Sequence, residues 1–137
     1  MTQHDAFETA LRALRSRDQS VAELARRLES RGVGEEERTD VLERLDRAGY
    51  VDDASFAQRR DAALAERGSG DALIRDDLER RGIAAELVDA AVESLEPELE
   101  RVARIVERRG SSAKTARYLA ARGFGEEAFA GLVAQEE

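Results

Sequence analysis

Basic residues gather in one window near the carboxyl end of an otherwise acidic chain. The 137-residue sequence carries 22 Lys and Arg against 30 Asp and Glu, a net charge of −8, yet the only acidic residue in the window 101–122 is Glu107. Such a window can bind the phosphates of a nucleic acid or an acidic face of a protein. Arginine supplies 21 of the 22 basic residues, and its planar guanidinium favours bidentate contacts. The candidate partner-binding residues of this window are Arg101, Arg104, Arg108, Arg109, Lys114, Arg117 and Arg122.

Helix ends offer a second explanation for some of these arginines. Arg108 and Arg122 are predicted near helix C-termini, where a cation offsets the negative end of the helix dipole. Arg31, Arg81 and Arg122 each precede a glycine, and we interpret these three mainly as capping or packing groups.

Residues suited to catalysis or metal binding are scarce. The chain has no cysteine and one histidine, His4, which excludes disulfides and thiolate metal sites. Asp46, Asp52 and Asp53 could be imagined as a metal cluster, but helix capping explains the adjacent pair and the spacing of a calcium loop is missing. The glycine-rich turn 68–70 lacks the lysine of a phosphate loop. We therefore predict no catalytic residue, no metal and no cofactor, and a protein that is not an enzyme.

One phrase occurs three times: a leucine, three further residues, a glycine, and then a bulky apolar residue. The glycines are 50 and then 41 residues apart, a spacing typical of tandem supersecondary units. We predict three repeats, 1–49, 50–96 and 97–137, with Pro97 at the first helical position of the third. Their net charges are −2, −6 and 0. The three phrases run from Leu28 to Gly32 and Val33, from Leu78 to Gly82 and Ile83, and from Leu119 to Gly123 and Phe124.

Apolar residues within a repeat recur at intervals of three and four, which predicts amphipathic helices. Each repeat is therefore expected to contain three helices, each of about three turns. In the first repeat the three apolar sets are Phe7, Leu11 and Leu14, then Val21, Leu24 and Leu28, and finally Val41, Leu42 and Leu45.

Capping residues mark where the middle helices begin and end. Ser20 followed by Glu23 predicts a capping box in the first repeat. Ser111 is expected at the equivalent position of the third repeat, and Ser69 or Gly70 in the second. The repeated glycine is expected to end the middle helix in the left-handed conformation, and the apolar residue after it to pack back on the last turn.

The repeat register also predicts which basic residues lie on the exposed side of their helix. On the middle helix of the third repeat, Thr115 and Leu119 set the buried side, so Lys114 and Arg117 should point outward, which favours recognition. Arg26 occupies in the first repeat the position that Arg117 has in the third, and we include it among the candidate partner-binding residues.

Composition predicts a thin core and a cytosolic protein. The chain is 42% hydrophobic, but 24 of these residues are alanines, which bury little area. The longest run without Asp, Glu, Lys or Arg covers eight residues, 128–135, too few for a membrane span or a secretion signal.

The connection between the first two repeats has a distinctive sequence. Gly49 can end one helix and Asp53 can cap the next. With these neighbours the chain resembles the RecX family, regulators of the RecA recombinase, along essentially its whole length. The signature residues are Gly49, Tyr50, Asp52, Asp53, Phe56 and Ala57.

The resemblance implies an all-α fold in which three tandem three-helix repeats form an elongated, curved array. It also implies a cytoplasmic, monomeric regulator that binds RecA filaments on single-stranded DNA and limits filament growth, ATP hydrolysis and strand exchange, with weak direct DNA contact as a further expectation. Two alternatives remain open. One is a helix–turn–helix-like nucleic-acid-binding module, which the net charge of −8 disfavours. The other is a helical scaffold for a different protein.

Overall fold

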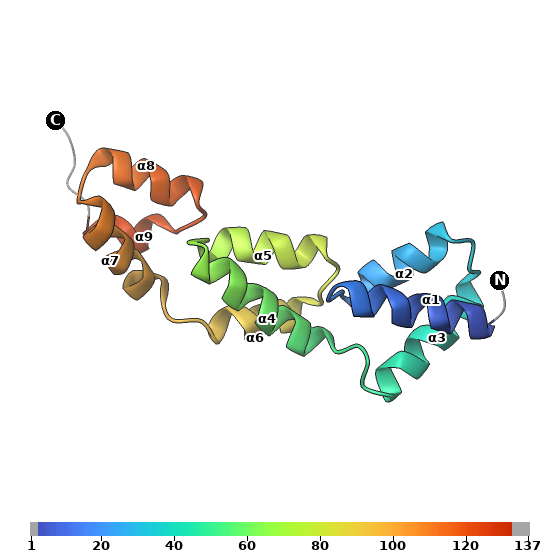
Figure 1. Ribbon diagram of the computed structural model, residues 1–137. Helices are drawn as coiled ribbons and strands as arrows, with labels where there is room; N and C mark the ends of the chain where they lie inside the picture. The colour runs from blue at the N-terminus through green and yellow to red at the C-terminus, as the bar shows by residue number, and fades with distance from the viewer. Residues whose placement is uncertain (1–2, 133–137) are drawn as a thin grey trace.

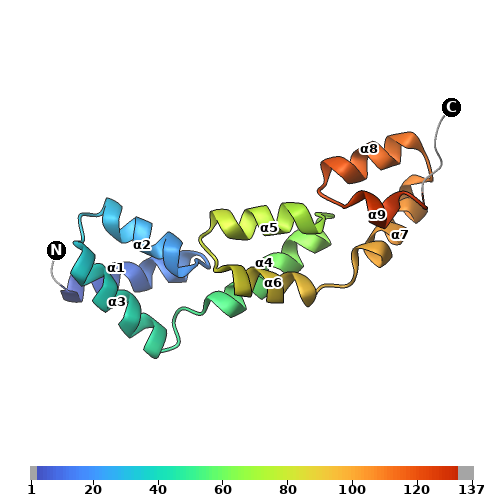
Figure 2. The same cartoon turned by 180° about the vertical axis from the view of Figure 1, so that it is seen from behind.

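The computed structural model describes residues 3–132, with side chains from residue 5 onward, and every regular element in this range is an α-helix. This agrees with the predicted fold class. The helices follow one another in three groups along an elongated, bent array, with the two chain ends at opposite extremes (Figures 1 and 2). The side chain of His4 lies outside the described residues. The helices are α1 (Gln3–Ser16), α2 (Val21–Ser30), α3 (Glu35–Arg47), α4 (Asp53–Glu66), α5 (Asp71–Arg80), α6 (Ala85–Glu93), α7 (Glu98–Arg109), α8 (Ala113–Ala121) and α9 (Glu126–Phe129).

Each group of three helices has its own hydrophobic cluster. Leu28, Leu78 and Leu119, the leucines of the repeated phrase, are fully buried, one in each cluster. Val51 packs in the first cluster although it follows the predicted repeat boundary after residue 49. The boundaries of the repeats stay predictions, but the separate clusters mean that each group buries its own apolar face.

The repeated glycines end the middle helices as predicted. Gly32, Gly82 and Gly123 have φ values of 84°, 79° and 88°. The N–H of the next residue donates 3.1 Å back to the leucine carbonyl of the last turn in all three copies, for example from Val33 to Leu28. This is the six-to-one hydrogen bond of a Schellman motif. The chain is thereby turned directly into the following helix.

The helix starts agree with the sequence at two positions and correct it at two. Ser20 and Glu23 form the predicted capping box, since the Glu23 N–H donates to Ser20 Oγ over 3.1 Å and the Ser20 N–H donates to Glu23 Oε1 over 3.0 Å. Of the two residues expected before the second middle helix, Ser69 and Gly70, it is Gly70 that directly precedes α5. The prediction for Ser111 was wrong: α7 continues to the stop at Gly110, and the later Ser112 has the extended backbone of a cap and accepts from the Thr115 N–H. Pro97 lies one position earlier than predicted, as the cap of α7.

Asp53 does not cap its own helix, contrary to our prediction. Asp52 has the extended backbone that a cap requires and accepts from the Ser55 N–H over 3.2 Å. The carboxylate of Asp53 instead accepts from the N–H of Val21, at the start of α2, over 2.9 Å. The first residue of the second helix group therefore satisfies an unpaired donor of the first group.

The same contact recurs between the second and third groups. Glu98, the first residue of α7, accepts from the N–H of Asp71, the first residue of α5, over 2.7 Å. In each pair of groups, the turn with the repeated glycine also docks on the start of the preceding middle helix. We call the contact of residues 20–23 with the turn 81–82 the first junction, and the contact of residues 70–73 with the turn 122–123 the second junction.

None of the described helices is long and apolar enough to cross a membrane. Within residues 3–132, no group of three or more acidic or histidine side chains is placed to hold a metal ion.

Candidate functional site

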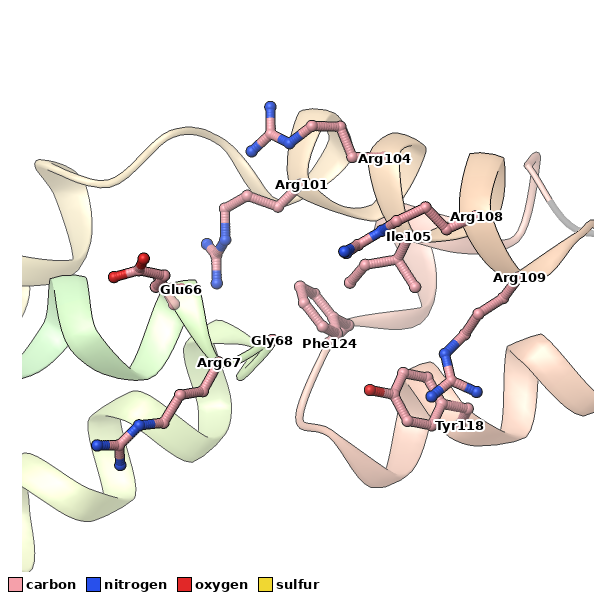
Figure 3. Close-up of a pocket in the computed structure, with 11 residues that line it drawn as sticks. Glu66, Arg67, Gly68, Arg101, Arg104, Ile105, Arg108, Arg109, Tyr118 and Phe124 are labelled. Carbon is pink, nitrogen blue, oxygen red and sulfur yellow. The ribbon is translucent and has the colours of Figure 1, made fainter.

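A cleft of about 600 Å³ opens between the end of α4 and the length of α7, beside the second junction (Figure 3). Five of its eleven lining residues are arginines, and Ala65, Ile105 and Phe124 form its apolar part. The cleft thus brings part of the basic window together with residues from the preceding helix group. Its lining residues are Ala65, Glu66, Arg67, Gly68, Arg101, Arg104, Ile105, Arg108, Arg109, Tyr118 and Phe124.

The helical spacing of α7 places its arginines along the cleft. Val102 and Ile105 are buried in the third hydrophobic cluster. Residues three and four apart lie on one side of a helix, so Arg101, Arg104 and Arg108 follow one another along the edge of this apolar face. Gly110, with φ of 91°, then ends the helix. The arginines are therefore held by a packed helix and not by a loop.

Arg101 serves the interior of the protein. It is 7% exposed, and its guanidinium donates to Asp71 Oδ1 and to the Ser69 carbonyl, each over 2.7 Å. The same group lies over the Phe124 ring, 5.4 Å from its centre. The prediction that Arg101 binds a partner from the surface is therefore corrected, because burial and these bonds commit it to the second junction.

Arg122 also bonds within the chain. Its side chain donates to the carbonyls of Arg67, over 2.9 Å, and Gly68, over 3.3 Å. These carbonyls lie at the end of α4, so the cation offsets the dipole of a helix in another group. Arg122 therefore does cap a helix end, although it is the end of α4 and not that of its own helix, and its role in partner contact stays a prediction.

Arg104 is exposed but already has an anionic partner. It forms a two-point ion pair with Glu96, the Nη1 to Oε1 distance being 2.6 Å. The hydrogen bond from Arg104 lowers the pKa of the Glu96 carboxyl below its usual value. Arg104 therefore contributes less positive potential to the cleft than an unpaired arginine would.

Three arginines of the cleft are exposed and have no carboxylate partner within ion-pair distance among the described residues. Arg67 follows the last residue of α4, and Arg108 and Arg109 end α7. Arg109 lies over the Tyr118 ring, with its guanidinium carbon 3.4 Å from the ring centre. Figure 3 shows the Arg67 guanidinium pointing away from α7, so Arg108 and Arg109 are the unpaired cations on the α7 side of the cleft.

Lys114, Arg117 and Arg26 lie elsewhere. Thr115 and Leu119 are buried, as predicted, and Lys114 and Arg117 are exposed on the other side of α8, outside the cleft lining. Arg26 is exposed on α2, in the first helix group. The structure therefore does not bring all the predicted contact residues into one site.

A buried carboxyl lies close to the second junction. Asp61 of α4 is 1% exposed, and its Oδ2 has no hydrogen-bond partner among the described residues. Burial raises the pKa of Asp61 to about 6, against the smaller lowering effects of hydrogen bonds from Ala62 and Ser94 and of the charge of Arg101. The second helix group therefore carries a carboxyl that titrates close to neutral pH.

The signature residues around the first connection are mainly structural. Gly49, with φ of 79°, ends α3, and Phe56 and Ala57 are buried in the second hydrophobic cluster. Tyr50 differs from them because 56% of it is exposed. Burial raises the pKa of Asp53, whose carboxylate caps α2.

Sequence reasoning missed Arg67, Glu66 and Tyr118 as parts of the cleft. Arg67 precedes a glycine as Arg31, Arg81 and Arg122 do, and this pattern indicated only a helix end. The spacing of residues in the sequence does not connect Arg67 with α7, because the two meet only when the second and third helix groups pack together.

Comparison with known proteins gives consistent matches. A family model described as "RecX, first three-helix domain" matches residues 6–45. A "Regulatory protein RecX" of Trichlorobacter lovleyi is 38% identical over 109 residues, covering 77% of this chain and 71% of the relative. One of Deinococcus radiodurans is 34% identical over 126 residues, covering 85% of this chain and 60% of the relative. The crystal structure of RecX from Lactobacillus salivarius has the same fold, with a TM-score of 0.83 at 17% identity, covering 94% of this chain and 92% of that one.

Proposed function

The chain belongs to the RecX family of regulatory proteins, and on this premise we propose that it binds filaments of the RecA recombinase on single-stranded DNA and limits their growth and ATP hydrolysis. The observation that carries the proposal is the match to RecX relatives over most of the chain. The relatives are named as regulatory proteins, and the proposed action is accordingly binding without catalysis.

The shape of the array supports this function. Three helix groups with separate cores are held in order by two junctions, so the molecule presents a long surface and not one compact face. A long surface can contact several subunits of a filament or cover its growing end. We therefore propose a steric mechanism, in which a bound monomer hinders subunit addition and the conformational cycle of ATP hydrolysis in the cytoplasm.

Charge contributes to the orientation of this complex. The first two predicted repeats carry net charges of −2 and −6, whereas the third is neutral and has the arginine-lined cleft at its border. A local positive surface on an acidic protein favours an orientation in which that surface faces an anionic target. We propose that the cleft faces the filament and its DNA.

A filament assay tests the proposal. Purified protein is added at equimolar ratio to RecA on single-stranded DNA with ATP, and ATP hydrolysis and filament length are measured. We expect both to fall. If neither changes, the proposed function is wrong. A DNA-binding module acting alone would instead bind DNA in a salt-dependent manner and leave RecA activity unaffected.

A further inference from the structure

We propose that the second junction is a proton-sensitive hinge, in which the Arg101 guanidinium leaves Asp71 and turns to Asp61 when the Asp61 carboxyl loses its proton. The third helix group is then held by α4 in place of the start of α5, and the bend of the array changes. The hinge is a property of the free chain and goes beyond the proposed function, because it needs neither RecA nor DNA.

Two buried polar atoms beside this junction lack a partner, and they are complementary. Asp61 is 1% exposed, and its Oδ2 accepts no hydrogen bond from the described residues. Arg101 is 7% exposed, and its Nε–H donates to no acceptor among them. Buried polar atoms are nearly always paired, and an unpaired one costs free energy. A free acceptor and a free donor of opposite charge can satisfy each other.

The two side chains already act on each other. Figure 3 shows the Arg101 side chain pointing from α7 toward the helices of the second group, which include α4 with Asp61. The charge of Arg101 lowers the pKa of Asp61, against the larger raising effect of burial. The closed arrangement therefore contains an attraction between these groups that no hydrogen bond yet completes.

The free edge of Arg101 suits a carboxylate. Arg60 holds both carboxylate oxygens of Asp77 through Nε and Nη2, over 3.0 and 2.9 Å. In Arg101, Nη2 donates to the Ser69 carbonyl over 2.7 Å and Nε is unpaired. A guanidinium that turns this edge to Asp61 releases the Ser69 carbonyl and draws Nη1 away from its present acceptor. The residues that begin α5 thereby lose both bonds to α7.

The carboxyl of Asp61 lies at a position that the other helix groups fill with an apolar residue. Counted back 17 residues from the leucine of the repeated phrase, the chain has Leu11, Asp61 and Val102, and all three are buried. A leucine or valine fills this core position without a charge, so packing does not require the carboxyl. Departures of this kind from a structural pattern are expected at functional positions.

Ionisation makes Asp61 the stronger competitor for the guanidinium. The side chain of Asp71 is 33% exposed, so its carboxylate is hydrated when the ion pair opens. The carboxylate of Asp61 is shielded from water, and a buried charge without a partner is strongly unfavourable. Ser94 relieves it only in part, because the Ala91 carbonyl also takes the single hydroxyl hydrogen, over 2.6 Å.

The surroundings of Asp61 leave Arg101 as its partner. Among the described residues, Arg101 is the one whose charge acts appreciably on Asp61. The helices α5 and α6, which pack on α4, bury only apolar side chains. The nearby charged residues of α4, α5 and α7 are paired with one another: Arg60 with Asp77, and Arg104 with Glu96.

The direction of the pH dependence follows from the partner that each form of Asp61 accepts. Burial raises the pKa of Asp61 to about 6 in the closed arrangement. The ionised carboxylate gains a partner in the second arrangement, so the midpoint of the change lies at or below pH 6. Arg101 stays on Asp71 at lower pH and is on Asp61 at higher pH.

Distances between helix groups test the hinge. The chain has no cysteine, so Glu79→Cys on α5 and Ala120→Cys on α8 place two spin labels at exposed positions on either side of the second junction. Pulsed electron–electron double resonance at pH 5.0 and pH 7.5 measures the distance. We expect one dominant distance at pH 5.0 and a second population that is about tenfold larger at pH 7.5, the ratio of the ionised fractions for a pKa of about 6.

The matched control spans the first junction, with labels at Glu29→Cys on α2 and Glu79→Cys on α5, both exposed. Its distance should be the same at the two pH values, because neither Asp61 nor Arg101 belongs to that junction. All these measurements are made without RecA, so their outcome is independent of the proposed function.

Three variants separate the hinge from a purely structural role. Asp61→Asn cannot ionise and should keep the pH 5.0 distance at both pH values. Asp61→Leu restores the apolar pattern and should do the same, so the result does not depend on the folding of one variant. Asp71→Ala removes the present acceptor of Arg101 and should move the midpoint to lower pH by about one unit. Circular dichroism checks that each variant is folded at both pH values.

Two results would overturn the hinge. In the first, the labels across the second junction report the same distance in the intact chain at pH 5.0 and pH 7.5, which means that Arg101 stays on Asp71 while Asp61 is ionised. In the second, Asp61→Asn responds to pH as the intact chain does, which assigns the change to another group.

Discussion

The two junctions make the same contact with different chemical groups. At the first junction, side chains connect the helix groups: Ser20 Oγ donates to the Arg81 carbonyl over 2.6 Å, and Arg81 Nη1 donates to Glu23 over 2.9 Å. Arg81 also donates to Asp77, and Arg60 donates to the same carboxylate. The first junction is therefore a network of partly buried charges.

At the second junction, the backbones meet directly. The Gly70 N–H donates to the Arg122 carbonyl over 2.7 Å, and the Ala72 N–H donates to the Gly123 carbonyl over 3.1 Å. A Cβ atom on Gly70 would lie 2.4 Å from the Gly123 carbonyl carbon, so a side chain has no room. Close backbone contact here replaces the serine and the acidic network of the first junction.

This difference explains why the cleft lies beside the second junction. In the first, Arg81 is held by Glu23 and Asp77, and its charge is neutralised. In the second, Arg101 and Arg122 bond the carbonyl end of α4, and Arg108 and Arg109 of α7 are left without acidic partners among the described residues. The contact at the first junction thus neutralises its arginine, whereas the contact at the second junction leaves unpaired arginines beside it.

The largest expected effect comes from filling the close contact at the second junction. Gly70→Ala should lower the free energy of unfolding by about 3 kcal/mol, because the new methyl group forces the backbones apart. Gly70 has φ of −83°, so alanine itself is not strained there. Urea unfolding measures the change.

The matched control is Gly34→Ala, since Gly34 also precedes a helix, has φ of −67° and would place its Cβ in open space. It should cost no more than about 1 kcal/mol, the usual range for alanine at a cap. Equal costs for the two variants would contradict the close contact.

The dependence of the free energy of unfolding on pH should report the buried carboxyl of Asp61. Burial raises the pKa of Asp61 from its ordinary value of 3.8 to about 6 in the folded protein, so the folded state binds the proton more tightly. Its stabilising contribution is complete below about pH 4 and is lost as the pH rises through 6. Asp61→Asn should therefore raise the free energy of unfolding at pH 7.5 by about 2 kcal/mol and flatten its decrease between pH 4 and pH 7.

Asp46→Asn is the control for this series, because Asp46 is exposed. Its curve of unfolding free energy against pH should follow that of the intact chain. A pH profile of Asp61→Asn identical to that of the intact chain would show that Asp61 is ionised at no cost in the folded state.

At the first junction, Ser20→Ala should lower the free energy of unfolding by about 2 kcal/mol. The variant loses both the helix cap and the bond to the Arg81 carbonyl. Ser112→Ala removes a cap that has no bond across a junction in the described structure and should cost about 1 kcal/mol. If thermal melts show equal losses, the contact across the first junction contributes nothing.

The smallest effect concerns an exposed ion pair between the first two helix groups, outside the first junction. Arg59 donates two hydrogen bonds to Asp18, at 2.8 and 3.1 Å, and both side chains are largely exposed. Arg59→Gln should cost about 0.5 kcal/mol at low salt, and the difference should vanish at about 1 M salt. Urea midpoints at the two salt concentrations measure it. A loss that persists at high salt would assign Arg59 a packing role.

Local features were predictable because each depends on neighbours in the sequence. The glycine stops, the capping box at Ser20 and the all-α fold follow from residues within about one turn. Asp52 and Asp53 show the limit of this approach: both suit a cap, and the choice depends on the contact that Asp53 makes with Val21 in another helix group.

The cleft could not be derived in the same way. Arg101 resembles its neighbours in sequence but is buried and donates to Asp71, 30 residues away. Arg67 and Arg108 line the same cleft only because the second and third groups pack together at the second junction. Basic composition therefore indicated the region, and the three-dimensional packing decided which arginines are available.

The carboxylates of Asp53 and Glu98 give the array a direction. Each completes the start of a helix in the group before it, so every unit except the last depends on its successor. During synthesis the chain emerges from its N-terminal end. The first middle helix thus acquires the hydrogen bond to its first N–H only when the second unit has begun, and the second middle helix only when the third unit has begun. Each of the first two units therefore completes the hydrogen bonds of its middle helix only after the start of the next unit has been synthesised.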